Sequence, residues 1–259
     1  MTLKVGFHQP VRLRETQAVL RRLPEAVSPL RILHFSDIHL AGRKRQEGRL
    51  LELLSSVPAD MIVFTGDALY RYESDGAIAL RFFERLAELV HPHLGFHLVR
   101  GNHDNAGAVS LLRNAGFSLL INSYTVIGEG ASSWYLVGVD DSRWTADSQR
   151  WECHVLPTVL KDVPAESFKI VMAHSPDILP AAAAAEVDLV LTGHTHGGQI
   201  RFPGVGALMT RTIVSSRYAW GLQTYENTLC HTTCGAGSSF PPIRLSCPQE
   251  VVLLELVRG

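Results

Sequence analysis

Five short hydrophobic runs, each followed at once by Asp, His or Asn, constrain the fold of this chain more than any other feature. The runs are residues 32–35, 61–64, 96–99, 168–172 and 187–191. Each has the length of a β-strand and is almost continuously apolar, which is typical of strands covered on both faces. Because such strands alternate here with helical segments, the sequence predicts an α/β fold.

The segments with helical periodicity are residues 47–56, 77–90, 106–114 and 177–185. In the second of them, Ile78, Phe82, Leu86 and Leu89 form one apolar stripe. Residues 118–140 and 227–257 read instead as consecutive strands with Gly and Ser turns and no helix between them. We therefore expect two mixed sheets packed between helical layers, a four-layer α/β/β/α sandwich in which residues 1–259 form one domain.

The polar clusters that follow the five runs contain the residue types that bind metal ions. They are Asp37-Ile38-His39, Gly66-Asp67, Gly101-Asn102-His103-Asp104, Ala173-His174 and Gly193-His194-Thr195-His196. In open α/β sheets the loops at the carboxyl ends of the strands converge on one crevice. A single Asp-x-His or Gly-Asp is also common in ordinary turns. The requirements of folding alone do not explain why all five clusters fall on the same predicted edge of the sheet.

The order of these five clusters resembles that of the calcineurin-like metallophosphoesterase superfamily. Its blocks run Asp-x-His, Gly-Asp, Gly-Asn-His-Asp/Glu, His and Gly-His-x-His, and all lie between Asp37 and His196. The following Gly197-Gly198-Gln199 and the tail Pro242-Ile243-Arg244 with Cys247-Pro248-Gln249-Glu250 resemble a bacterial branch. That branch includes generic phosphoesterases and UDP-2,3-diacylglucosamine pyrophosphatases. Cys234-Gly235-Ala236-Gly237 departs from the more basic segment usual there.

The resemblance implies a site with two divalent metal ions and a metal-bridging hydroxide that hydrolyses a small-molecule phosphate ester. It assigns Asp37, His39, Asp67 and His196 to one ion, and Asp67, Asn102, His174 and His194 to the other. This mixed set of oxygen and nitrogen donors suits Mn²⁺ best, with Fe or Zn²⁺ as alternatives. Two ions bring four positive charges, and the two carboxylates neutralise half of them.

His103 is the histidine of the motifs that the family pattern leaves without a metal. We expect it to protonate the leaving group or to hydrogen-bond a phosphoryl oxygen, with Asp104 setting its tautomer. Two further functions remain open: a UDP-2,3-diacylglucosamine pyrophosphatase, which must cover two acyl chains, and a scaffold of the same fold without catalysis. No long apolar insertion favours the first, and no missing ligand favours the second.

Charge and hydropathy limit the partners of this chain. The formal net charge is −1, so the sequence carries no strong signal for nucleic acid and disfavours a nuclease. The first thirty residues are locally basic, with Lys4, Arg12, Arg14, Arg21 and Arg22, and predict an edge hairpin or short helix. A weak peripheral contact with an anionic membrane is the alternative. Without a signal peptide pattern or an apolar span of 18 residues, we expect a cytoplasmic protein; the sequence does not indicate its oligomeric state.

Other polar and aromatic side chains are weaker candidates for substrate contacts. These are Arg43-Lys44-Arg45, Arg201 and the tryptophans Trp134, Trp144, Trp151 and Trp220. For the charged residues we expect solvated loop positions, and for the tryptophans core packing, more than contact with substrate. The cysteines Cys153, Cys230, Cys234 and Cys247 lack a second ligand pair at zinc spacing, so we expect ordinary packing.

Overall fold

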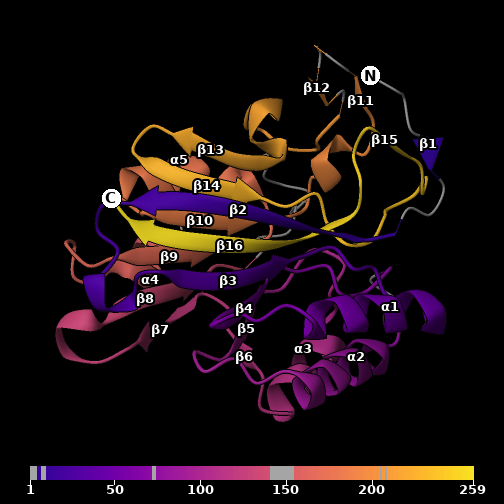
Figure 1. The fold of residues 1–259 in the computed structure, drawn as a ribbon, viewed down its shortest axis with the longest axis horizontal. Helices are drawn as coiled ribbons and strands as arrows, with labels where there is room; N and C mark the ends of the chain where they lie inside the picture. Colours follow the sequence, from indigo (N-terminus) through magenta and orange to yellow (C-terminus); the bar gives the residue numbers. More distant parts are fainter. Residues whose placement is uncertain are drawn as a thin grey trace.

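Two six-stranded mixed sheets pack face to face, with helices on their outer faces (Figure 1). The computed structural model describes residues 5–6, 10–71, 74–140, 155–202, 204, 206–207 and 209–259. The α/β class and the four-layer sandwich predicted from the sequence are confirmed. Of the candidate substrate contacts and cysteines, Trp144, Trp151 and Cys153 lie outside the described residues.

The first sheet carries three of the five predicted metal motifs. Its strand order is β2 (Arg12–Leu20), β16 (Glu250–Arg258), β3 (Leu30–Phe35), β4 (Met61–Phe64), β5 (Phe96–Leu98) and β6 (Ser118–Leu119). Strands β3 to β6 run parallel, whereas β16 is antiparallel to β3 and parallel to β2. The helices α1 (Lys44–Ser55), α2 (Gly76–Leu89) and α3 (Ala106–Asn114) cover its outer face.

The second sheet carries the other two motifs. Its order is β13 (Gly221–Tyr225), β14 (Thr228–Thr232), β10 (Leu189–Thr192), β9 (Lys169–Met172), β8 (Trp134–Gly138) and β7 (Ser123–Ile127). Helices α4 (Val155–Leu160) and α5 (Leu179–Ala184) cover it. Two short strand pairs complete the structure: β1 (Val5–Gly6) with β15 (Arg244–Leu245), and β11 (Arg201–Phe202) with β12 (Gly206–Ala207).

Five 3₁₀ turns are found among the described residues. They are η1 (Glu25–Val27), η2 (Gly130–Ser132), η3 (Pro176–Ile178), η4 (His196–Gly198) and η5 (Ser216–Ala219). The single helix predicted for residues 177–185 is wrong in detail, because η3 precedes the shorter α5. Pro176 at the start of that turn favours this tighter entry, since its side chain fixes φ and its nitrogen cannot donate.

The hydrophobic core between the sheets draws side chains from both of them. Ile32, Met61 and Leu254 of the first sheet pack with Leu136 and Leu189 of the second. Sheets that are buried on both faces explain why the sequence runs were apolar throughout instead of alternating. This rigid double layer aligns the carboxyl ends of β3, β4 and β5 beside those of β9 and β10.

The prediction of a hairpin or short helix in the first thirty residues is wrong. Residues Arg12–Leu20 form a nine-residue edge strand instead, in which alternate residues such as Ala18 and Leu20 are buried. The partner of this strand is β16, at the other end of the chain, and a local pattern cannot reveal such a pairing. Two arginines of the basic stretch contact acidic groups: Arg14 lies 3.8 Å from Glu250 and Arg22 2.6 Å from Asp188.

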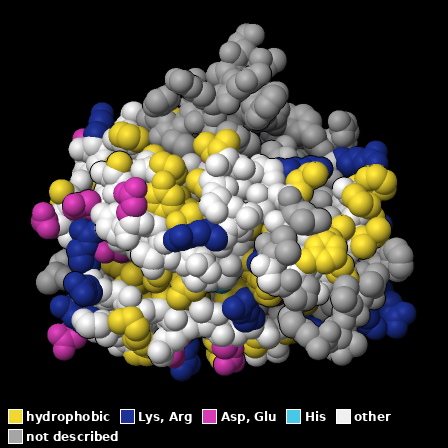
Figure 2. All heavy atoms as spheres, turned by 90° about the horizontal axis from the view of Figure 1, so that it is seen from above, with side chains coloured by type: hydrophobic (Ala, Val, Ile, Leu, Met, Phe, Trp, Pro, Cys, Tyr) yellow, Lys and Arg dark blue, Asp and Glu magenta, His cyan; other side chains and the backbone are white. Residues whose placement is uncertain are grey.

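The surface seen from above is mixed in character (Figure 2). Its hydrophobic side chains form separate groups, Lys and Arg side chains are scattered across it, and Asp and Glu side chains lie toward its left and lower edges. No helix of the described ranges combines the length and the apolar character that crossing a bilayer demands.

Candidate metal centre

All seven predicted ligands lie at the carboxyl ends of strands and form one connected group of contacts. His196 Nε2 lies 3.0 Å from His39 Nε2 and 3.5 Å from Asp37 Oδ1. Asp67 Oδ2 lies 3.8 Å from His39 Nε2 and 3.3 Å from His174 Nε2.

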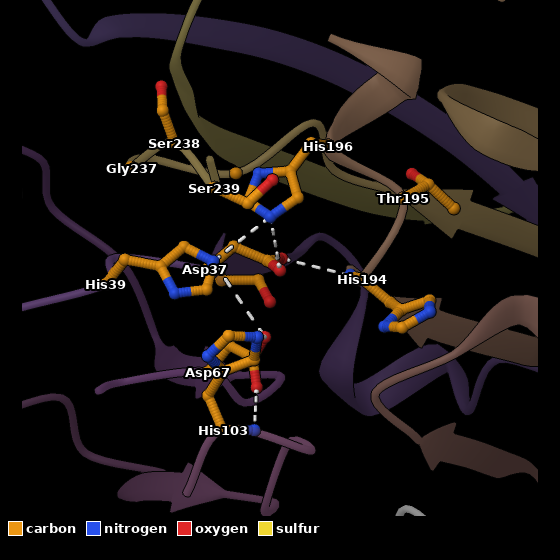
Figure 3. Close-up of polar contacts among 12 residues, drawn as sticks. Asp37, His39, Asp67, His103, His194, Thr195, His196, Gly237, Ser238 and Ser239 are labelled. Carbon is orange, nitrogen blue, oxygen red and sulfur yellow. Dashed lines mark hydrogen bonds and ion pairs between the residues drawn. The ribbon is translucent and has the colours of Figure 1, made fainter. Parts of the chain in front are cut away.

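Two further contacts extend this group to the remaining predicted ligands. The ring of His174 packs edge-on against that of His194, with the centroids 4.9 Å apart, and Asn102 Oδ1 lies 3.1 Å from His194 Nδ1. Figure 3 shows His39, His103 and His196 pointing toward the two carboxylates.

The backbone at these positions adopts a conformation that non-glycine residues rarely take. Five of the predicted ligands have positive φ: Asp37 (52°), His39 (47°), Asp67 (59°), His194 (66°) and His196 (49°). Each left-handed residue costs roughly 1–2 kcal/mol relative to ordinary helical or extended backbone. These turns redirect the chain directly after each strand and bring the side chains together at one edge. Strain of this kind concentrates at functional sites.

Two glycines allow the ligand loops to approach each other closely. A Cβ on Gly101 would overlap the carboxylate of Asp67, and a Cβ on Gly193 would overlap Asp37 Oδ2 and Ser36 Oγ. The Gly residues of the Gly-Asn-His-Asp and Gly-His-Thr-His motifs therefore make room for the carboxylates of the other motifs.

Backbone carbonyl groups orient three of the imidazole rings. The Nδ1–H groups of His39, His103 and His174 donate to the carbonyl oxygens of Leu69 (3.0 Å), Tyr70 (2.9 Å) and Thr65 (2.7 Å). Because a carbonyl only accepts, each ring carries its proton on Nδ1 and turns Nε2 toward the carboxylates. A metal-binding histidine is usually held by such a partner behind the ring.

His196 is held by a cation instead of a carbonyl group. The Arg244 guanidinium is buried: its Nη2 lies 3.2 Å from His196 Nδ1 and donates to the Cys234 carbonyl oxygen at 2.8 Å. Arg244 also donates to the carbonyl oxygen of Gly237. We did not assign a site role to Arg244 from the sequence, although it lies in the tail whose residues resemble the bacterial branch.

Burial lowers the pKa of three of the predicted ligand histidines and so favours their neutral form. It lowers the pKa of His39 and, with His174 beside it, lowers the pKa of His194 to about 4. Burial, His39 and Arg244 hold the pKa of His196 well below its usual value. Neutral imidazoles offer the lone pairs that a metal ion requires.

The two carboxylates respond to their surroundings in opposite directions. Burial and the nearby Asp67 raise the pKa of Asp37. Burial also acts to raise the pKa of Asp67, but the imidazoles of His174 and His39 beside it outweigh burial and hold this pKa below the ordinary range. Oδ1 of Asp37 is buried and makes no hydrogen bond within the described chain. A buried carboxylate oxygen of this kind is costly unless a cation compensates it.

The donor set therefore fits divalent metal ions. Three triads place ligand atoms within 4.8 Å of one another: Asp37 with His39 and His196, Asp37 with Asp67 and His174, and His39 with Asp67 and His103. Asp67 belongs to two of the triads, and its Oδ2 lies 4.0 Å from His103 Nε2. All donors are oxygen or nitrogen atoms, as in metal-dependent hydrolases with Mn²⁺, Fe or Zn²⁺.

Asp104 does not set the tautomer of His103, contrary to our prediction. The Tyr70 carbonyl oxygen accepts the hydrogen bond from His103 Nδ1–H instead. The Asp104 carboxylate points into the loop that carries Asp67. Its Oδ2 accepts hydrogen bonds from the N–H of Asp67 at 2.8 Å and of Gly101 at 3.0 Å. Its Oδ1 accepts from the N–H of Ala68 and Leu69. The turn after β5 directs the side chain inward, so Asp104 holds the backbone under Asp67.

The weaker candidates divide into structural and peripheral residues. Trp134 is fully buried and packs on Phe168, so it belongs to the core. Arg201 stacks over Trp220 at 5.2 Å and donates to the Gly197 carbonyl oxygen at 3.0 Å, beside His196. Cys230, Cys234 and Cys247 are buried thiols without a disulfide.

Comparison with known proteins agrees with this geometry. A family model described as calcineurin-like phosphoesterase matches residues 30–198. Phosphodiesterase YaeI of Escherichia coli (strain K12) is 31% identical over 89% of this chain and 83% of its own length. A transmembrane protein with metallophosphoesterase domain from Danio rerio is 28% identical over 97% of this chain, which spans 59% of that protein.

A comparison with solved structures shows that other proteins share this fold. TT1561 of Thermus thermophilus matches with a TM-score of 0.54 over 81% of this chain and 92% of TT1561, at 15% identity. The buried oxygen and nitrogen donors at the edge of this sandwich form a site that could hold divalent metal ions. The chain belongs to the calcineurin-like phosphoesterase family, as its motifs predicted. It is a metallophosphoesterase, an enzyme that hydrolyses phosphoric ester bonds with divalent metal ions.

The contacts of Asp104 predict that it positions the metal ligands. Asp104→Ala leaves four backbone N–H groups without their acceptor, and each buried unsatisfied group costs about 1–3 kcal/mol. We expect Asp104→Ala to lose metal, measured as ions per chain by elemental analysis. Asp188→Ala is the matched control, because Asp188 also accepts a backbone N–H, from Lys169, but at the opposite end of β10. Equal metal content in the two variants would contradict this role for Asp104.

Proposed function

We propose that this chain hydrolyses a small-molecule phosphate ester at a centre of two divalent metal ions that share the Asp67 carboxylate. One ion would be held by Asp37, His39, Asp67 and His196, and the other by Asp67, Asn102, His174 and His194. The contacts of Asp67 with both groups of ligands carry the proposal, because its Oδ2 lies near His39 on one side and His174 on the other. A carboxylate placed between two groups of ligands in this way can bridge two neighbouring ions.

Mn²⁺ is the metal we assign to both positions, with Fe or Zn²⁺ as alternatives. The donors are hard oxygens and borderline imidazole nitrogens, without a thiolate. Bound ions would supply charge neutralisation for the phosphoryl oxygens and would activate the attacking nucleophile. Asp37 and Asp67 neutralise half of the four charges, so the pocket stays attractive to a phosphate group.

His103 is the residue we assign to proton transfer. Its side chain is 31% exposed, whereas those of His39 and His174 are 1% and 0% exposed, so His103 can reach a bound substrate. Its Nδ1–H is held by the Tyr70 carbonyl, and its own N–H donates to Asp67 Oδ1 at 2.8 Å. The ring is therefore fixed beside Asp67, with Nε2 4.0 Å from Asp67 Oδ2.

A phosphomonoester or phosphodiester is the substrate class we favour over the alternatives. The surface in Figure 2 mixes both signs of charge, which does not favour a nuclease. The complete set of ligand residues opposes a scaffold without catalysis. The UDP-2,3-diacylglucosamine pyrophosphatase alternative stays open, and one observation favours it: a partly apolar pocket beside His39.

We further propose a cytoplasmic location with at most weak peripheral contact with anionic membranes. The three described cysteines are free thiols, as a reducing compartment maintains them. Arg14 and Arg22 contact Glu250 and Asp188, so part of the N-terminal basic charge is already neutralised.

Metal removal tests the proposed function directly. Chelation should abolish hydrolysis across a panel of phosphomonoester, phosphodiester and pyrophosphate substrates, because both the nucleophile and the charge neutralisation depend on the ions. Added Mn²⁺ should restore it. The substrate that recovers the highest kcat/KM identifies the preferred bond. Full activity of metal-free protein, verified by elemental analysis, would overturn the proposal.

The role of His103 can be separated from that of the metals by varying the leaving group. An alkyl alcohol must be protonated as its P–O bond breaks, whereas p-nitrophenolate leaves as the anion. We expect His103→Gln to lose about 10²–10⁴-fold in kcat on an alkyl phosphate ester. The loss on p-nitrophenyl esters should be much smaller, with unchanged metal content.

The matched control for this experiment is His194→Ala, which should damage both substrates alike. Equal losses on both substrates for His103→Gln would indicate stabilisation of the phosphate instead of proton transfer. Loss of metal from His103→Gln would make His103 a ligand, as its triad with His39 and Asp67 allows.

A further inference from the structure

A pocket of ≈ 260 Å³ opens beside the metal centre and has no part in the chemistry described above. One wall is α1, a second is the loop from Ile38 to Ala41, and a third is the C-terminal segment with Ala236, Ser238 and Pro242. Its volume is close to the lower limit, roughly 300 Å³, of small-molecule binding sites.

Part of the pocket wall consists of buried apolar side chains. Ile38, Leu40, Leu50 and Ala236 line it, each at most 7% exposed, and all four belong to the core cluster under α1 to α3. These side chains are held by packing on the sheet, so the apolar wall is preformed. A preformed apolar wall binds an alkyl or aryl group without first having to order itself.

Two connections join this pocket to the metal ligands. His39 and Tyr70 both line it, and their rings contact edge-to-face with centroids 6.4 Å apart. On the other side, Ser238 Oγ accepts from Arg244 Nε at 3.1 Å, and Arg244 Nη2 lies 3.2 Å from His196 Nδ1. The pocket and the metal centre therefore share His39 as a common wall, so a group that fills the pocket lies next to the metal ligands.

Polar groups in the lining suit a charged head with an apolar group attached. Arg43 and Arg49 are exposed and line the pocket, where they attract an anionic ester. Oε1 of Glu47 is buried there and makes no hydrogen bond within the described residues. A hydroxyl on the ligand would supply the missing donor.

We propose that this pocket binds the organic group of the substrate, and that this group is apolar: the substrate is an amphiphilic phosphate ester. This subsite rests on the proposed hydrolysis at the metals and names the class of ester. The phosphate lies at the ligands and the apolar chain lies between α1 and the C-terminal segment.

A series of alkyl p-nitrophenyl phosphates with methyl, butyl and hexyl chains tests the subsite, at concentrations below micelle formation. The leaving group is constant, so only the chain varies. We expect kcat/KM to rise about fourfold for each methylene that becomes buried, through KM more than kcat. Ala41→Trp fills the pocket from an exposed position of its lining and should bring the hexyl-to-methyl ratio of kcat/KM close to one.

Ala115→Trp is the matched control, because Ala115 is exposed at the end of α3, outside the pocket lining. It should keep the wild-type ratio. Equal kcat/KM along the series, or a ratio that Ala41→Trp leaves unchanged, overturns the subsite but leaves the phosphoesterase activity intact.

If the protein hydrolyses none of these esters, the result counts against the proposed function and not against the subsite. Calorimetric binding of hexylphosphonate and methylphosphonate to the Mn²⁺-loaded protein then decides the subsite. Tighter binding of the hexyl compound that Ala41→Trp abolishes supports it, and equal binding overturns it.

Discussion

The buried carboxylate of Asp67 is the group on which the rest of the site depends. It contacts His39 and His174 from two different sheets and accepts the N–H of His103. Taking a carboxylate out of water costs several kcal/mol unless opposite charge and hydrogen bonds compensate it. Burial lowers the pKa of His39 and favours its neutral form, so divalent ions fit the charge that the buried carboxylates of Asp67 and Asp37 require. The packing of the two sheets brings ligand residues from both of them to the same edge.

The positions of the ligands are maintained by strained turns and by the groups behind them. Asp37, His39, Asp67, His194 and His196 all have left-handed backbone, which only a well-packed surrounding can sustain. The double sheet supplies that rigidity through its core. Asp104 secures the loop under Asp67, and backbone carbonyl groups orient three of the histidines. Arg244 lies behind His196. The strain at the site is thus balanced by hydrogen bonds and packing just outside it.

Local patterns in the sequence predicted the parts of the molecule that depend on neighbouring residues. The helix expected at residues 106–114 is found at Ala106–Asn114, and the five apolar runs are strands. The ligand types were readable because each motif directly follows a strand. Features that depend on distant segments were not readable: the pairing of β2 with β16, the turn of Asp104 toward Asp67, and the contact of Arg244 with His196. The pocket between α1 and the C-terminal segment is invisible in the sequence for the same reason.

The most direct test of the central claim is anomalous diffraction from crystals of the Mn²⁺-loaded protein, recorded on both sides of the manganese edge. The account predicts two anomalous peaks about 3.5–4 Å apart, with an oxygen of Asp67 bound to both. His39 and His196 should contact one peak, and His174 and His194 the other. A single peak, or two peaks of which only one touches Asp67, would contradict the shared carboxylate and with it the proposed centre.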